Sequence, residues 1–341
     1  MRIPYQPGHG VSELEKAIER VRLEFDPGHF ATVEAALLRP SDLSEVRAGT
    51  KPLYGMMDQA QRRYALKLGR LELMAAEQAA YELRHLGRRP CLPARVVDVE
   101  LEGLGPVQGL LKPFVEFDPK RELSPDTRTW SELQRSVVLL EHAWEWLLDN
   151  SDTNTSQYAL IGEQGYPLNI DWDRSFATGA RSELSRFEKY KVVLPNARTF
   201  LYSDYVEGKI DLPFSVLHAE ARRIRLLPVT RVREIVEGYA RVCFADAAER
   251  AAFVSRVLRR QRHIEADFKR FARDLLRERV AVSVAPQADV QSRLRQGMTL
   301  LWDRSQVPLH WIARGPVGTT GRKLLRFARR RLWFNLAQRS S

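Results

Sequence analysis

WLLDNSDTNTSQYALIGEQGYPLNIDWDRSF, residues 146–176, contains two acidic clusters separated by short hydrophobic runs. The first cluster carries Asp149 and Asp152, and the second carries Asp171 and Asp173. YALIG and PLNI have the pattern of two short strands joined by the turn GEQGYP. A hairpin brings its two outer ends together, so the pattern predicts that both clusters lie close enough to share one divalent cation. The alternative is that both are ordinary turns, in which Asp, Asn and Ser bond to nearby backbone groups.

The composition is that of a folded protein with a basic balance. The 341 residues, 44% of them hydrophobic, are enough for two lobes or domains in one compact unit. Lys and Arg number 54 against 43 Asp and Glu, and the net charge of +11 favours anionic partners. Cys91 and Cys243 are far apart and lack a CxxC spacing, so we expect free thiols. The seven histidines form no HExxH pair, which argues against a zinc site.

Neither a membrane span nor a secretion signal is expected. No run of 18 or more apolar residues occurs in the sequence. The first residues, MRIPYQPGHG, lack the apolar centre of a signal peptide. We therefore expect a cytoplasmic protein.

The order of helical and strand patterns predicts the fold class. Helical spacing of apolar residues is found in residues 11–24, 71–86 and 131–148, and again through most of 214–280. Strand patterns occupy segments 45–69, 95–102 and 105–117. Gly87 is typical of a helix end, and Ser131 is a good helix N-cap. The pattern predicts an α+β fold with two lobes: a small N-terminal sheet lobe with one helix, and a larger, mainly helical C-terminal lobe.

Four landmarks in this order resemble the protein-kinase-like fold, in the atypical branch that includes HipA-type bacterial kinases and the phosphatidylinositol 3- and 4-kinases. YALKLG places Lys67 late in a strand, and EQAAYELRHLG places Glu77 inside the following helix. DNSDTNTSQYALI (149–161) resembles the catalytic loop of this family. LNIDWDRSF (168–176) resembles the metal-binding segment that follows a short hairpin. The similarity spans roughly residues 50–176, and more loosely the helical region to about 280.

The resemblance implies a role for each landmark. Lys67 would contact the α- and β-phosphates of ATP, and Glu77 would hold its ammonium, with Glu72 as the alternative partner. Asp152 would take the place of the catalytic aspartate that orients or deprotonates the acceptor hydroxyl. Asp171 would take the principal metal-ligand position.

The remaining metal ligands follow from the same comparison. Gln157 stands where the family has a metal-binding asparagine, and Asn154 stands where atypical kinases often have histidine. Asp173 is a possible second carboxylate ligand. A shifted register, in which Asp149 is catalytic and Asn154 is the ligand, stays open.

Nucleotide contacts are expected from two strand regions. The phosphate-binding segment PLYGMMDQAQ (52–61) has a single glycine, Gly55, where typical kinases have several. The strand that includes Lys112, Phe114, Val115 and Glu116 would supply backbone groups to the adenine edge.

The resemblance implies an ATP- and Mg²⁺-dependent phosphotransferase that moves the γ-phosphate to a hydroxyl, with Ser or Thr of a protein as the leading acceptor. Alternatives are a small-molecule or lipid kinase, a pseudokinase or AMP-transferring variant, and a basic helical nucleic-acid-binding protein without catalysis. The basic segment GRKLLRFARRRLWFNL (321–336) could lie on an anionic membrane or nucleic acid, or dock on the larger lobe. The expected domains are an N-terminal helical extension (1–44), a small nucleotide-binding lobe (45–118), a helical catalytic lobe (119–285) and a basic C-terminal extension (286–341).

Overall fold

The computed structural model describes residues 9–25, 27–34, 38–40, 53–101, 104–115, 122–150, 153–176 and 197–284. The chain divides into two compact units, Met1–Arg279 and Val280–Ser341. The elements discussed below, apart from the last turn of the final helix, belong to the first unit.

A five-stranded antiparallel sheet forms the small lobe. Its strand order is β1-β2-β3-β5-β4, with β1 (Arg39–Pro40), β2 (Leu53–Met57), β3 (Arg63–Lys67), β4 (Arg95–Leu101) and β5 (Gly105–Pro113). In β4, buried Val97, Val99 and Leu101 alternate with exposed residues, as a half-buried strand requires. β5 pairs with both β3 and β4, and its Leu110 and Leu111 are both fully buried. The sheet is therefore covered on both faces around β5.

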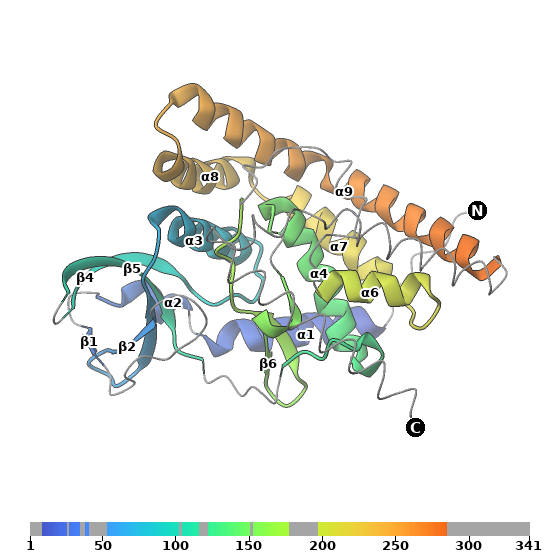
Figure 1. Cartoon of the computed structure of the whole chain (residues 1–341), viewed down its shortest axis with the longest axis horizontal. Coiled ribbons are helices and arrows are strands. Elements are labelled where there is room, and N and C mark those ends of the chain that lie inside the picture. Colours follow the sequence, from blue (N-terminus) through green and yellow to red (C-terminus); the bar gives the residue numbers. More distant parts are fainter. Residues whose placement is uncertain are drawn as a thin grey trace, which may run out of the picture. The chain divides into compact units, whose positions relative to one another are not determined.

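Helix α3 (Leu71–Leu86) packs beside the sheet, and Figure 1 shows it between β5 and α8. Met74 packs with Leu110, and the Val96 backbone N–H donates to Gln78 Oε1 at 2.8 Å, which ties the helix to β4. The helix ends at Gly87, as the sequence predicts. A Cβ atom there would lie 2.6 Å from the ring of Trp144, so a glycine is required where α3 meets the larger lobe.

The larger lobe is built around α4 (Glu132–Leu148). Ser131 and Gln134 form a capping box at its start, as expected for the predicted N-cap. Every residue from Ser136 to Leu148 is buried, whereas the sequence pattern indicated one apolar stripe. Neighbours pack around it on several sides: α6 (Ala197–Val206), α7 (Phe214–Arg225) and the second hairpin strand. Two further helices complete the lobe, α8 (Val229–Cys243) and α9 (Ala247–Val284).

The predicted hairpin is present after α4. Strand β6 (Tyr158–Ile161) pairs antiparallel with β7 (Tyr166–Asn169), and Tyr158 lies opposite Asn169. Gly162 and Gly165 close the turn with φ values of 66° and 63°, a conformation that glycine adopts without strain. The start of β6 and the end of β7 therefore lie together, which is the arrangement on which the shared-ion prediction depends.

The N-terminal segment adds two helices, α1 (His9–Glu24) and α2 (Pro27–Thr32). Two short 3-10 turns belong to the larger lobe: η3 (Thr127–Thr129) precedes α4, and η4 (Thr155–Gln157) precedes β6. The predicted α+β, two-lobed class is confirmed by these elements. The predicted domain limits at 44, 118 and 285 stay a prediction. No helix in the described ranges combines the length and the apolar character that crossing a membrane requires.

Candidate active site

Lys67, the last residue of β3, contacts three carboxylates. Its Nζ lies 3.1 Å from Glu77 Oε2 on α3. It also lies 3.0 Å from Asp171 Oδ1 and 3.0 Å from Asp173 Oδ2, both just after β7. The four residues, which we call the Lys67 cluster, join the sheet lobe to the hairpin of the larger lobe. Sequence reasoning placed each of these residues at one candidate site, and the structure brings all four together.

Local structure explains how the side chains reach one place. Tyr64 and Leu66 of β3 are buried in the core of the sheet, so strand alternation places Lys67 on the other face. Beyond β7, the Asp171 backbone N–H donates to Asn169 Oδ1 at 3.0 Å, which turns the chain sharply. Asn169 is 1% exposed and was not among the predicted residues. Its position two residues before an aspartate is the signal that would have indicated this turn.

A second lysine, Lys112 of β5, also reaches Glu77. Its Nζ donates to Glu77 Oε1 and, at 2.6 Å, to the carbonyl oxygen of Ile170. The sequence had marked Lys112 for its backbone, as part of an adenine-binding strand. The structure places its side chain among the buried charges of the cluster, and the backbone contact with adenine stays a prediction.

The charges of the cluster shift one another's pKa. Burial alone lowers the pKa of Lys67, but the carboxylates of Glu77, Asp171 and Asp173 outweigh it and raise the pKa above its ordinary value. Burial raises the pKa of Glu77, and the ammonium groups of Lys112 and Lys67 reverse this, so the net pKa is lowered. The pKa of Asp171 is raised by burial and then by Glu77, against the opposing effect of Lys67. Glu77 is thus held ionised, whereas the pKa of Asp171 stays above its ordinary value.

The two aspartates fit a divalent cation. Their Lys67-facing oxygens are each 3.0 Å from one nitrogen, so they cannot be further apart than twice that distance. The Lys67 ammonium already lies between them as a cation. Within the described ranges, no group of three or more His, Cys, Asp or Glu side chains is placed to hold a metal ion by itself. Mg²⁺ commonly binds one or two carboxylates together with phosphate oxygens and water, so this pair suits an ion that arrives with a nucleotide.

Gln157 and Asn154, the predicted amide ligands, are engaged locally. Gln157 Oε1 accepts from the Asn154 backbone N–H at 3.1 Å, and Asn154 Oδ1 accepts from the Ser156 N–H at 3.1 Å. Together these bonds form a capping box on η4. Asn154 Oδ1 also accepts from the Ser156 hydroxyl, so metal binding by this oxygen would require the cap to open. A metal role for either amide stays a prediction.

The two candidates for the catalytic aspartate differ in what the structure describes. Asp152 lies outside the described residues, as does Glu116 of the predicted adenine strand. Asp149 ends α4 in a left-handed conformation with φ 55°, and its Oδ1 lies 3.4 Å from Arg260 on α9. Glu72, the alternative partner for Lys67, lies 3.4 Å from Arg70 in the first turn of α3, whereas Glu77 contacts the lysine.

The predicted nucleotide-contact residues lie on the sheet. Gly55 is within β2, opposite Ala65, and not in a loop. Phe114 follows β5, and its backbone N–H donates to the Arg63 carbonyl at 3.0 Å, so this group is already used in the sheet. Val115 comes next and is partly exposed. Nucleotide contacts by these residues stay predictions.

A buried ion pair anchors the helix that carries Glu77. Arg84, near the end of α3, donates two hydrogen bonds of 2.6 Å to Glu141 on α4, and both side chains are 0% exposed. The Arg84 guanidinium also lies 4.6 Å from the ring centre of Trp172, which stands between the two cluster aspartates. Sequence reasoning did not find this pair, because neither residue type nor spacing distinguishes it from exposed charges on two separate helices.

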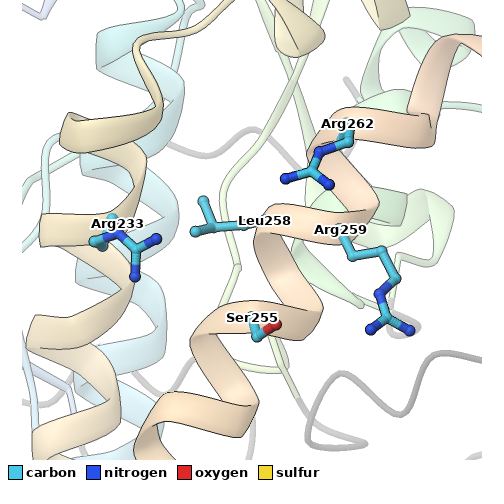
Figure 2. Close-up of a pocket in the computed structure, with 5 residues that line it drawn as sticks. All are labelled: Arg233, Ser255, Leu258, Arg259 and Arg262. Carbon is cyan, nitrogen blue, oxygen red and sulfur yellow. The ribbon is translucent and has the colours of Figure 1, made fainter.

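A separate basic pocket of about 300 Å³ lies between α8 and α9. It is lined by Arg233, Ser255, Leu258, Arg259 and Arg262. Figure 2 shows Leu258 and Arg262 pointing from α9 toward α8, which carries Arg233. Because three arginines and no carboxylate line this pocket, it suits an anion.

Comparisons with known proteins find structural similarity only. No protein-family model and no curated protein matches the sequence. The structure is similar to the proinflammatory kinase CtkA of Helicobacter pylori, with 8% identity and a TM-score of 0.44 over 71% of this chain and 99% of that chain. It is also similar to the golgi casein kinase, with 13% identity and a TM-score of 0.35 over 78% of this chain and 76% of that chain. HipA of the Shewanella oneidensis MR-1 toxin–antitoxin system matches with 13% identity and a TM-score of 0.36, over 72% of this chain and 75% of that chain. All three TM-scores are below 0.5.

Proposed function

We propose that this chain is an ATP- and Mg²⁺-dependent phosphotransferase. The observation that carries the proposal is the Lys67 cluster, in which one partly buried lysine bridges Glu77 of the small lobe and two aspartates of the larger lobe. Phosphoryl transfer needs neutralisation of phosphate charge and a positioned acceptor more than it needs covalent catalysis. Lys67, together with an Mg²⁺ ion that the two adjacent carboxylates would hold, would provide the first of these requirements.

Each residue of the Lys67 cluster has a separate role in this proposal. Lys67 donates hydrogen bonds to phosphate oxygens, and Glu77 orients its ammonium. Asp171 and Asp173 hold Mg²⁺, which when bound neutralises charge on the phosphates. Asn169 fixes the turn that presents Asp171.

The transfer itself moves one phosphoryl group. The acceptor hydroxyl oxygen forms a bond to the γ-phosphorus while the bond from that phosphorus to the β,γ-bridging oxygen breaks, and ADP leaves with the electron pair. The hydroxyl proton goes to a carboxylate, for which Asp152 is our candidate. Asp149 is the alternative, although its contact with Arg260 favours a structural role.

The acceptor that we propose is a Ser or Thr hydroxyl of a protein. A small-molecule or lipid hydroxyl is the alternative within the same chemistry, and a pseudokinase or AMP transfer are the alternatives on the same fold. Binding of an anionic partner is favoured by a different observation, the arginine-lined pocket between α8 and α9. Nucleic acid or an anionic membrane could also meet the basic C-terminal segment, which lies outside the described residues.

Nucleotide binding tests the proposal. ATP with Mg²⁺ at 100 times its dissociation constant should raise the free energy of unfolding by about 2.7 kcal/mol. Asp171→Asn should remove most of the Mg²⁺-dependent part of this gain. Asp98→Asn, at an exposed position on β4, serves as the matched control and should keep it. Absence of any nucleotide effect, together with salt-sensitive binding to unrelated DNA or RNA, would instead support the non-catalytic alternative.

A further inference from the structure

Lys112 brings a second ammonium to the Lys67 cluster. Its side chain is 11% exposed and lies near the end of β5, the strand next to β3. One nitrogen contacts both Glu77 on α3 and the carbonyl oxygen of Ile170, the residue directly before Asp171. A single side chain thus connects the sheet, the helix that carries Glu77 and the segment that carries the two aspartates.

Glu77 divides its two carboxylate oxygens between the two lysines. Oε2 faces Lys67 and Oε1 faces Lys112. Lys67 also contacts Asp171 and Asp173, whereas the hydrogen bonds of Lys112 go to Glu77 and to a backbone carbonyl. The two ammonium groups are therefore not equivalent: that of Lys67 contacts the two aspartates, and that of Lys112 bonds to Glu77 and to the backbone.

This difference matters when phosphates approach. A lysine has three donors, and those of Lys67 are already directed at three carboxylates. Turning toward phosphate oxygens weakens its contact with Glu77, which is 2% exposed. A buried carboxylate that loses its counter-charge is strongly destabilising. Lys112 provides a counter-charge that does not move with the ligand.

We propose that Lys112 is a positioning residue for the phosphotransferase reaction, an inference that rests on the proposed function. Its ammonium keeps Glu77 in place while Lys67 turns to the nucleotide phosphates. Through the Ile170 carbonyl it also fixes the segment that presents Asp171. The nucleotide contacts Lys67 and not Lys112.

An acyl-phosphate derivative of ATP tests this division on the unmodified protein. The neutral amine of a lysine near the phosphates attacks the acyl carbon, forms an amide and releases ATP, and the labelled lysine is identified by mass spectrometry. We expect Mg²⁺-dependent labelling of Lys67 that excess ATP prevents, with none on Lys112. Labelling of Lys112 in place of Lys67 would overturn the inference. Labelling of neither lysine, with no nucleotide binding, would overturn both the inference and the proposed function.

A double-mutant cycle tests whether Lys112 acts through Glu77. Lys112→Met should lower kcat/KM for MgATP consumption about 10- to 100-fold, the usual effect of losing a hydrogen bond to a charged group. The loss should fall mainly on kcat, because Lys67 still reaches the phosphates. The Lys112→Met, Glu77→Gln double variant should lose less activity than the sum of the two single losses, because only the contribution of Lys112 through the Ile170 carbonyl remains to be lost.

A lysine outside the cluster provides the matched control for Lys112→Met. Lys269→Met removes an exposed lysine on α9 and should leave the kinetics unchanged. Wild-type kinetics in Lys112→Met would overturn the inference and leave the proposed function standing. Fully additive losses in the double variant would show that Lys112 does not act through Glu77 and would also overturn it. The labelling result decides the question if Lys112→Met does not fold.

Discussion

Replacement of Lys67 by methionine should destabilise the protein and at the same time create a site that a divalent cation can stabilise. The substitution leaves Asp171 and Asp173 facing each other without the ammonium between them. Two unit charges no more than about 6 Å apart repel by at least about 3 kcal/mol at an effective dielectric constant of about 20. Loss of one partner from a buried ion pair costs about 3–5 kcal/mol. The Asp171 side chain is 35% exposed and is screened by water, so we expect the lower end of this range, about 3 kcal/mol.

Urea denaturation with and without Mg²⁺ measures both effects. Mg²⁺ alone should change the free energy of unfolding of the wild type only slightly, because Lys67 already neutralises the aspartates. In Lys67→Met, Mg²⁺ at 100 times its dissociation constant should restore about 2.7 kcal/mol. In the control, Lys67→Met with Asp171→Asn and Asp173→Asn, the Mg²⁺ effect should disappear. Equal stabilisation of that triple variant, or a Lys67→Met protein as stable as the wild type, would refute the assignment of the acidic pair.

Three further predictions concern other parts of the structure. Glu141→Gln should lower the free energy of unfolding by about 3–5 kcal/mol, because it leaves the Arg84 guanidinium buried without a counter-charge. Replacing both Arg84 and Glu141 by methionine should lower the free energy of unfolding by less than Glu141→Gln does. A loss below about 1 kcal/mol in Glu141→Gln, measured by urea denaturation, would contradict the buried pair. Burial, and then Arg198, lower the pKa of His142 far below its usual value. The unfolded state therefore takes up a proton below about pH 6.5 that the folded state does not. The free energy of unfolding should therefore decrease by up to about 1.4 kcal/mol for each unit by which the pH is lowered. His142→Asn should remove this part of the slope in denaturation curves taken from pH 7.5 to 5, and an unchanged slope would contradict it. Finally, Arg259→Gln with Arg262→Gln should weaken binding of tripolyphosphate about tenfold by calorimetry. The stabilisation of this double variant by MgATP should equal that of the wild type. Undiminished binding of tripolyphosphate would show that the pocket between α8 and α9 is not an anion site.

Much of the candidate site could be predicted from sequence because its residues follow well-patterned elements. Lys67 ends a strand, Glu77 lies on a strong helix, and the two aspartates follow a hairpin with clear turn residues. In each case a local pattern fixes the element, and the element fixes the side of the chain on which the residue lies. The hairpin register places the aspartates next to the start of β6, and their contacts with Lys67 link them to the sheet lobe.

Other features depend on contacts that no local pattern encodes. Lys112 follows two fully buried leucines in β5, and its partner is set by the pairing of β5 with β3 and by the depth at which α3 packs. Gln157 is a different case: its amide satisfies a local cap three residues away, and its role as a metal ligand stays a prediction. The all-round burial of α4 likewise arises from neighbours far away in the sequence, which a single apolar stripe cannot predict.

The bidentate bond between Arg84 and Glu141 fixes the end of α3 against the larger lobe. Glu77 precedes Arg84 by seven positions, about 10 Å along the helix axis at 1.5 Å per residue. A tilt of about 10° around this end would displace Glu77 by about 2 Å, which would break its hydrogen bonds to both Lys67 and Lys112. The orientation of one helix therefore sets both lysine contacts at once, and the ion pair at its end holds that orientation.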